Sequence, residues 1–410
     1  MPARPPRSTS ASRSSRRTRS FADEHDVGLL QRTGFLRIDP VTAFAAIGLM
    51  VFSIVIIGLS TQDTVDGNPY FYVIRQGIYG IVGVALMLAL ARVDYSRFRE
   101  LRVGLYGTLL VLVTTVLLLA QATRGATRWI ELPFFRFQPS EIGKVLLVLA
   151  LAGFAIDRVR RYDGEVKRTV RLLALGAFPT FLILLQPDLD TTLVYGVITL
   201  TVMFLAGIDW RHFAALGGAV LGGLLVVLVI GPLFGFSVLQ GYQQERVTAF
   251  LSPQDCSSDT CYQTQQSLIA IGAGGKTGQG EDATQATSGF LPEAHTDFIF
   301  AVTAERWGFL GAAVLLSLYA LLVWRALRIA TLSKNLYGSL VAGAFAAMLL
   351  FQGFINVGMN LGILPVAGIP LPLVSYGGSS VLATFIAVGI IQSVYVQSQL
   401  ASPSRVRPAL

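Results

Sequence analysis

The chain has 410 residues, of which 53% are hydrophobic and 14% charged, and its formal net charge at pH 7 is +8. This small share of polar residues cannot cover the surface of a soluble globule of this size. A water-soluble domain is therefore excluded, and a lipid bilayer is the expected solvent. The basic residues are spread over short loops, which argues against the concentrated groove of a nucleic-acid-binding protein.

The first 39 residues are rich in Arg, Ser and Pro and contain no apolar run. They are expected to form a disordered cytoplasmic tail and not a cleaved signal. Residues 40–398 are expected to form one polytopic membrane domain, and residues 399–410 a second cytoplasmic tail.

Apolar runs long enough to cross a bilayer, roughly 20 residues each, follow one another along residues 40–398. The fold class predicted is an all-α integral membrane protein with about ten transmembrane helices, with nine or eleven as alternatives. Residues 186–190 are interpreted as a tight outer turn, because proline and two aspartates are poor residues for the bilayer centre. The ten runs begin near Val41, Phe71, Val103, Ile142, Leu172, Thr191, Phe213, Phe298, Tyr337 and Ser379.

The orientation follows from the distribution of the 32 Lys and Arg residues. Of these, 24 fall in the tails and in alternate loops, five in the opposite loops and three within or at the ends of spans. The positive-inside rule therefore places both termini in the cytoplasm.

Residues 236–296 form a long outer loop between the seventh and eighth predicted spans, and loops of this length are usually functional or disordered. Residues 265–271 have amphipathic spacing, and the glycine-rich residues 272–280 follow them. This glycine-rich segment, with Lys276, could contact phosphate or be a flexible turn. In the same loop, Cys256 and Cys261 could form a disulfide or remain two free thiols.

The outer loop 122–139 breaks the positive-inside rule with Arg124, Arg128 and Arg136, which could bind an anionic ligand or lipid phosphates. Glu141 and Lys144 follow three residues apart at the start of the fourth helix, so they share one face. A buried ammonium is costly, and Lys144 therefore needs an anionic partner from the protein or a ligand.

The eighth span is preceded by Glu293, His295 and Asp297 against an apolar wall, a setting that can raise the pKa of a carboxylate. The alternative for Asp297 is a helix N-cap. The uncharged, glycine-containing residues 368–380 before the tenth span could be a re-entrant segment or a tight connection. Cations for a phosphate-bearing ligand and one carboxylate base are what glycosyl transfer from a lipid pyrophosphate requires, and no Ser-His-Asp set or His/Cys metal cluster competes with this interpretation.

From Asp39 to about Gln397 the chain resembles the SEDS family of bacterial cell-wall polymerases, RodA and FtsW. The resemblance rests on motifs spread over the chain: Arg75-Gln76, residues 125–129, Arg136 with residues 138–141 and Lys144, residues 186–189, residues 292–300 and residues 368–380. Departures are Asp190 where the family usually has glycine, Arg306 where glutamate is common, and Ala283 in place of a glycine.

The resemblance implies a peptidoglycan glycosyltransferase of the bacterial cytoplasmic membrane that polymerises lipid II and works with a class B penicillin-binding protein and other membrane proteins of the elongation complex. Asp297 matches the family's catalytic aspartate, and a divalent cation, Mg or Mn, could assist. Candidate residues for binding the pyrophosphate or lipid II are Arg75, Arg128, Arg136, Glu141, Lys144, Asp188, Lys276, His295, Ser375 and Ser379.

Residues 93–95 look more like RodA, the elongation enzyme, than FtsW, the division enzyme. A flippase or secondary transporter for a lipid-linked precursor is the rival from another class, because a helical bundle alone does not define chemistry. A non-catalytic scaffold for the penicillin-binding protein is a third hypothesis, which leaves the buried charges unexplained.

Overall fold

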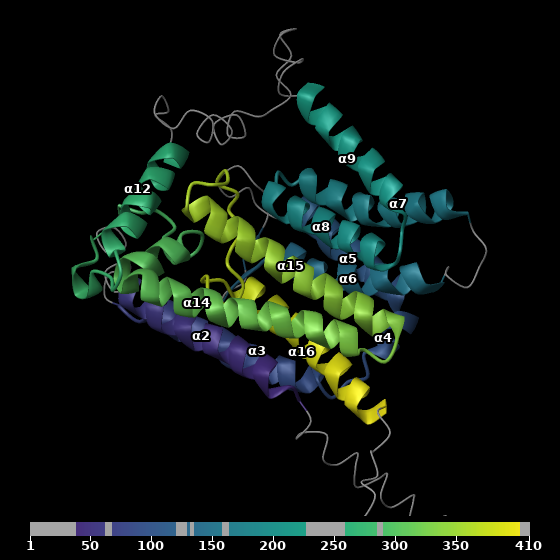
Figure 1. Ribbon diagram of the computed structural model, residues 1–410, viewed down its shortest axis with the longest axis horizontal. Coiled ribbons are helices and arrows are strands. Elements are labelled where there is room, and N and C mark those ends of the chain that lie inside the picture. The colour runs from purple at the N-terminus through teal and green to yellow at the C-terminus, as the bar shows by residue number, and fades with distance from the viewer. Residues whose placement is uncertain are drawn as a thin grey trace, which may run out of the picture.

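The computed structural model describes residues 38–61, 68–119, 129–131, 135–157, 164–226, 259–284 and 290–401. These residues form a helical bundle in which most long helices run roughly along one direction (Figure 1). The helices are α2 (Pro40–Ser60), α3 (Phe71–Leu90), α4 (Ser96–Glu100), α5 (Arg102–Leu119), α6 (Pro139–Asp157), α7 (Glu165–Leu184), α8 (Leu189–Leu205), α9 (Trp210–Leu225), α12 (Asp259–Gly274), the 3₁₀ helix η3 (Gly280–Asp282), α14 (Ile299–Leu332), α15 (Leu336–Asn360) and α16 (Gly378–Ala401).

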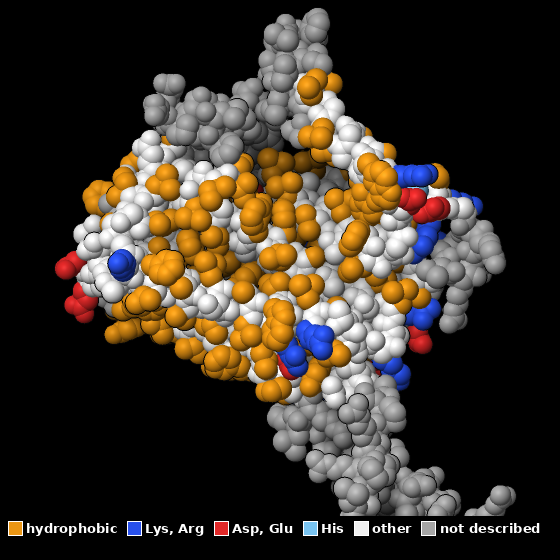
Figure 2. Space-filling view, in the orientation of Figure 1, with side chains coloured by type: hydrophobic (Ala, Val, Ile, Leu, Met, Phe, Trp, Pro, Cys, Tyr) orange, Lys and Arg blue, Asp and Glu red, His pale blue; other side chains and the backbone are white. Residues whose placement is uncertain are grey.

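Six of the described helices are long and apolar enough to cross a membrane: α2, α3, α6, α14, α15 and α16. Two shorter apolar helices, α5 and α8, accompany them. Figure 2 shows apolar side chains over most of the visible face, with Lys and Arg gathered toward one end of the bundle. An apolar exterior of this extent is suited to lipid and not to water.

The predicted apolar runs coincide with helices to within a few residues, except at the fifth. There α7 begins at Glu165, well before the predicted Leu172, because the charged first turns belong to the helix and not to the preceding loop. The turn predicted at residues 186–190 lies between the end of α7 and the start of α8. The sequence did not predict the small antiparallel hairpin of β1 (Ile130–Glu131) and β2 (Arg136–Phe137).

The glycine-rich segment after α12 packs against a kink in α14. Gly308 interrupts that helix with φ 63° and ψ −158°, a backbone conformation that favours glycine. The freed backbone groups bond the segment: Gln279 N–H donates to the Glu305 carbonyl at 2.8 Å, and Phe309 N–H donates to the Gly275 carbonyl at 2.9 Å. The turn is therefore ordered by α14, and the side chain of Lys276 within it is exposed.

Arg306, one of the departures from the family pattern, is buried beside this kink and joins three segments. Its guanidinium donates to the carbonyl of Gly280 at 2.8 Å and to the carbonyl of Leu59, near the end of α2, at 2.6 Å. Both acceptors are backbone groups that would otherwise lack an intrahelical partner. Arg306 thus fastens the loop after α12 to two helices.

A second polar tie lies at the opposite end of α2. The carboxylate of Asp39 caps that helix by accepting from Thr42 N–H at 2.9 Å, and Arg325 of α14 donates to both of its oxygens. The amide of Gln392 on α16 exchanges hydrogen bonds with the Asp39 backbone. Burial raises the pKa of Asp39, but the hydrogen bonds from Arg325 and Thr42 outweigh it, so the pKa lies below its ordinary value.

Asp39→Asn is expected to lower the free energy of unfolding by about 2 kcal/mol at pH 7, because asparagine keeps the cap but loses the charge facing Arg325. Because the pKa of Asp39 is lowered in the folded state, its charge contributes fully to stability above the pKa of the unfolded chain, about 3.9. This contribution is lost as the pH falls through the pKa of the folded state. Thermal unfolding in detergent should therefore show a difference at pH 7 that shrinks below about pH 4. Asp209→Asn is the matched control, since Asp209 also caps a helix, through Arg211 N–H, but is less buried than Asp39. An equal loss of stability there would contradict the role of the charge.

Candidate functional site

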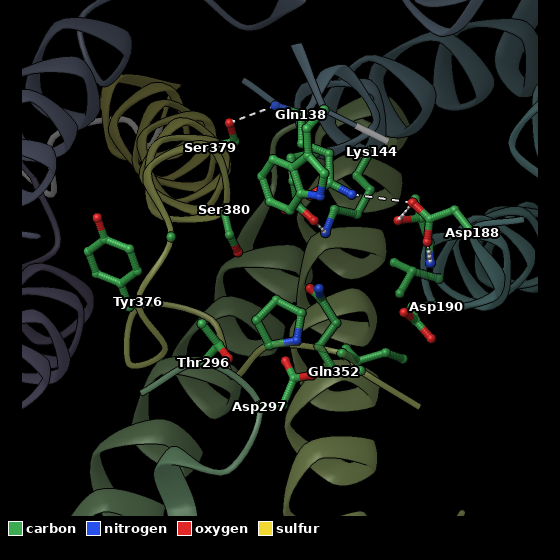
Figure 3. Close-up of a pocket in the computed structure, with 18 residues that line it drawn as sticks. Gln138, Lys144, Asp188, Asp190, Thr296, Asp297, Gln352, Tyr376, Ser379 and Ser380 are labelled. Carbon is green, nitrogen blue, oxygen red and sulfur yellow. Dashed lines mark hydrogen bonds and ion pairs between the residues drawn. The ribbon is translucent and has the colours of Figure 1, made fainter. Parts of the chain in front are cut away.

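A cavity of about 120 Å³, room for several water molecules, lies at one end of the bundle. Polar side chains point into it from several helices (Figure 3). It is lined by Trp129, Gln138, Glu141, Lys144, Asp188, Asp190, Thr191, Val194, Thr296, Asp297, Gln352, Gly368, Ile369, Pro370, Tyr376, Gly377, Ser379 and Ser380.

Most of these residues lie at or next to the first turn of a helix. Glu141 opens α6, Asp188 is the N-cap of α8, Ser379 opens α16 and Asp297 stands two residues before α14. Helix N-termini carry partial positive charge and unpaired N–H groups. Four of them at one cavity stabilise carboxylates that would be costly in an apolar interior.

Lys144 has the protein partner that the sequence required. Its Nζ lies 2.7 Å from Oε1 of Glu141, and the two side chains are only 4% and 6% exposed. A buried ion pair of this kind is held together because either charge alone would be poorly solvated. The charge of Lys144 is therefore neutralised by Glu141, and Lys144 is not available as a cation for binding a ligand.

Asp188 anchors a second network. Its carboxylate accepts from the backbone N–H and hydroxyl of Thr191 and from Nε2 of Gln138 at 3.2 Å. The backbone N–H of Gln138 in turn donates to the hydroxyl of Ser379 at 3.0 Å. This network joins the starts of α6, α8 and α16, so Asp188 fixes the relative positions of three helices that line the cavity.

Asp297 is positioned through its backbone by α15. The side-chain amides of Asn356 and Asn360 donate to the Asp297 carbonyl at 3.0 and 3.1 Å. Gln352, one turn earlier on the same face, lines the cavity. The sequence reasoning missed this stripe, although three amides at intervals of four residues in an apolar helix are the signal of a polar function within a membrane bundle.

Two carboxylates meet at Gly368, which precedes α16. A side-chain carbon placed on Gly368 would lie 2.8 Å from Oδ2 of Asp190 and 3.6 Å from Oδ2 of Asp297. Gly368 also has φ +70°, where other residues are strained. From the sequence, Asp190 is part of the predicted turn at residues 186–190 and a departure from the family pattern, with no role at the site. The fold brings it beside Asp297.

Gly368→Ala is expected to reduce activity at this site by about tenfold or more. The added methyl group would lie 2.8 Å from Oδ2 of Asp190 and must displace that carboxylate beside Asp297, in a site where about 1 Å of misplacement is costly. Gly207→Ala is the matched control: Gly207 also has φ +76°, but open space surrounds the position of an added Cβ. Turnover and thermal stability of both variants are to be compared. Equal losses of turnover would contradict the role of the space around the carboxylates.

An aromatic cluster borders the cavity on the side of α3. The ring of Tyr376 lies 4.9 Å from that of Tyr72 and 5.6 Å from that of His295, and the positive charge of Arg75 acts on the Tyr376 hydroxyl. Burial raises the pKa of Tyr376 to about 12, so its hydroxyl stays protonated at neutral pH. Burial lowers the pKa of His295, with Glu293 opposing, so His295 is neutral at pH 7.

The remaining predicted site residues lie apart from the cavity wall or outside the described residues. Arg136 is 67% exposed and 3.5 Å from Glu131, while its carbonyl accepts from Ser379. Ser375 is buried, and its hydroxyl donates to the Thr296 carbonyl and accepts from Leu371 N–H, which orders the loop. Cys261 is disulfide-bonded; Cys256, the only other cysteine of the sequence, and Arg128 lie outside the described residues.

The fold and the apolar exterior define a multi-pass helical membrane protein with a polar cavity at one end. A sequence profile of the FtsW/RodA/SpoVE family, described as cell cycle protein, matches residues 38–400. The chain therefore belongs to this family, which confirms the resemblance carried by the motifs.

Individual relatives agree. The chain is 36% identical over 372 residues to the peptidoglycan glycosyltransferase MrdB of Escherichia coli strain K12, covering 90% of this chain and 96% of the relative. It is 34% identical over 374 residues to a probable peptidoglycan glycosyltransferase FtsW of Geobacter sulfurreducens, covering 87% and 95%.

Solved structures show the same fold. A chain from work on the structural coordination of polymerization and crosslinking by a peptidoglycan synthase complex matches with TM-score 0.71 and 33% identity over 88% of this chain and 99% of that one. The rod shape determining protein RodA of Thermus thermophilus matches with TM-score 0.63 and 30% identity over 88% and 97%.

Proposed function

We propose that this protein is a peptidoglycan glycosyltransferase that polymerises lipid II at the outer face of the bacterial cytoplasmic membrane. The observation that carries the proposal is the position of Asp297 in a carboxylate-lined cavity at one end of the bundle, in a chain whose relatives are named peptidoglycan glycosyltransferases. The activity is attributed to this chain from that combination.

The proposed topology has ten spans, the eight apolar helices together with α7 and α9, and both termini in the cytoplasm. The basic residues of the α4 region, of the start of α7 and of the end of α14 all fall in segments assigned to the inner side. The cavity lies at the helix ends assigned to the other side. The positive-inside rule supports this orientation.

In the proposed reaction, the carboxylate of Asp297 accepts the proton of the acceptor sugar hydroxyl. That oxygen bonds to the anomeric carbon of the donor while the bond from this carbon to the phosphate oxygen breaks, and undecaprenyl pyrophosphate leaves with the electron pair. Direct displacement inverts the anomeric centre. A positioned general base contributes about 10²–10⁴-fold to such a step.

The charges of the cavity favour different positions for the acceptor sugar and the donor pyrophosphate. Glu141 neutralises Lys144, so the carboxyl groups of Asp188, Asp190 and Asp297 leave the cavity unsuited to an anion and suited to a sugar hydroxyl. The pyrophosphate is therefore proposed to lie outside the cavity, toward Arg136, whose backbone carbonyl accepts from Ser379 of the cavity wall, and Arg75, whose charge acts on Tyr376. Arg128 and Lys276 remain further candidates.

A divalent ion, Mg or Mn, is not assigned a step. Among the described residues no three His, Cys, Asp or Glu side chains are grouped as ligands. Mg²⁺ carried by substrate phosphates needs only one or two carboxylates from the protein. Strand formation with and without a chelator measures whether the reaction depends on such an ion.

The cellular role proposed is elongation, in the manner of RodA, with a class B penicillin-binding protein and other elongation-complex membrane proteins as partners. Residues 93–95 support RodA over FtsW, whereas the identities to relatives named MrdB and FtsW are nearly equal. The similarity to a chain from a peptidoglycan synthase complex supports a crosslinking partner.

The rival proposal, a lipid flippase or transporter, is disfavoured by where the polar groups lie. Transporters gather them near the bilayer midplane in broken helices, whereas this cavity is built mainly from first turns of helices. The test is the purified protein with lipid II and its class B partner, followed by separation of glycan strands and released undecaprenyl pyrophosphate. Strand formation supports the proposal; lipid II movement between leaflets of vesicles without strand formation contradicts it.

A further inference from the structure

Asp190 takes up no proton in the reaction described above, yet it shares the cavity with Asp297. It lies in the first turn of α8 and is 6% exposed. A Cβ atom added to Gly368 would lie within 3.6 Å of one carboxylate oxygen of each aspartate. Two carboxyl groups from segments far apart in the sequence therefore converge on one point in a buried space.

Like charges this close in a site of low dielectric constant interact strongly, and their protons come off as a coupled pair. The other titratable groups that line the cavity add no net positive charge to it. Glu141 and Lys144 from α6 cancel each other, Asp188 adds negative charge at the start of α8, and Tyr376 keeps its proton. The neighbouring helices α15 and α16 contribute uncharged Gln352, Ser379 and Ser380.

We propose that Asp190 is a positioning residue for the transfer reaction, which strengthens Asp297 as a base through the negative charge that it places beside it. When Asp297 takes the proton of the acceptor hydroxyl, the charge of the pair falls from two negative charges to one, and the repulsion between the carboxylates is relieved. That relief is realised only as the proton moves, so it favours the transition state over the bound substrate. The proton then passes to water before the next cycle.

The kinetic form of this inference rests on the proposed function. The experiment is the pH dependence of strand formation by wild type, Asp190→Asn and Asp190→Gly. Without the neighbouring charge Asp297 loses its proton at lower pH, so the acidic limb of the profile should move down by about one pH unit or more. The plateau rate should fall about three- to tenfold, because a weaker base transfers the proton less readily.

The control is Glu281→Gln, which removes an exposed carboxylate of η3 that does not line the cavity. Its acidic limb and plateau should match those of the wild type. If the limb of both Asp190 variants also coincides with that of the wild type while strands still form, the inference is overturned. A purely structural role for Asp190 predicts that outcome, with a lower rate at every pH.

A second measurement does not depend on activity. A hydrophobic carbodiimide reacts with protonated carboxyl groups, and peptide mass spectrometry gives the fraction of Asp297 labelled at each pH. In Asp190→Asn the labelling of Asp297 should disappear at a lower pH than in the wild type. Identical labelling curves for the two proteins overturn the inference even if the variant is inactive. If the curves differ but the wild type forms no strands, the charge coupling is upheld and the proposed function is contradicted.

Discussion

Asp297→Asn is expected to lower the rate of glycan strand formation from lipid II by about a thousandfold, within the range that a general base contributes. Asparagine has nearly the shape of aspartate but cannot accept the proton. Its backbone carbonyl still receives the amides of Asn356 and Asn360, so the loop before α14 keeps its place. The fold is expected to be intact.

The measurement is single-turnover strand formation by purified protein with its class B partner, alongside thermal unfolding and binding of lipid II. Asp282→Asn, an exposed aspartate of η3, is the matched control and should keep wild-type turnover. Wild-type strand formation by Asp297→Asn would rule out the base. Loss of lipid II binding in step with the loss of turnover would instead assign Asp297 to the binding of substrate.

The helices could be predicted from the sequence because a bilayer demands apolar runs of a set length. Hydropathy does not show where a helix continues past its apolar stretch, which is why α7 starts at Glu165 and not near Leu172. The β1–β2 hairpin has strands of two residues each, too short for any periodicity. The family was also predictable, because its motifs are spread over the whole chain.

The site was predicted in part. Glu141, Lys144, Asp188, Asp297 and Ser379 come together at one cavity. The sequence does not show which of these charges pair with one another. The spacing of Glu141 and Lys144 allowed an ion pair, but only the fold shows that the pair is formed and buried. Asp190 and Gly368 are far apart in the chain, and their proximity is a property of tertiary packing alone.

The packing against α15 shows the same limit. Gln352, Asn356 and Asn360 occupy one face of an apolar helix, which indicates a buried polar contact. The carbonyl of Asp297, which accepts from Asn356 and Asn360, is positioned by the loop geometry before α14. A polar stripe in a sequence therefore predicts that a partner exists without naming it.

The ion pair of α6 gives the largest expected effect on stability. Lys144→Met leaves the carboxylate of Glu141, whose side chain is 6% exposed, without its cation, and breaking a buried pair in this way typically costs about 3–5 kcal/mol. Glu141→Gln together with Lys144→Met removes both charges and should recover most of that loss. Unfolding of the four proteins in detergent by heat and denaturant completes the cycle. A double variant no more stable than Lys144→Met would show that Lys144 is required for packing and not for neutralising Glu141.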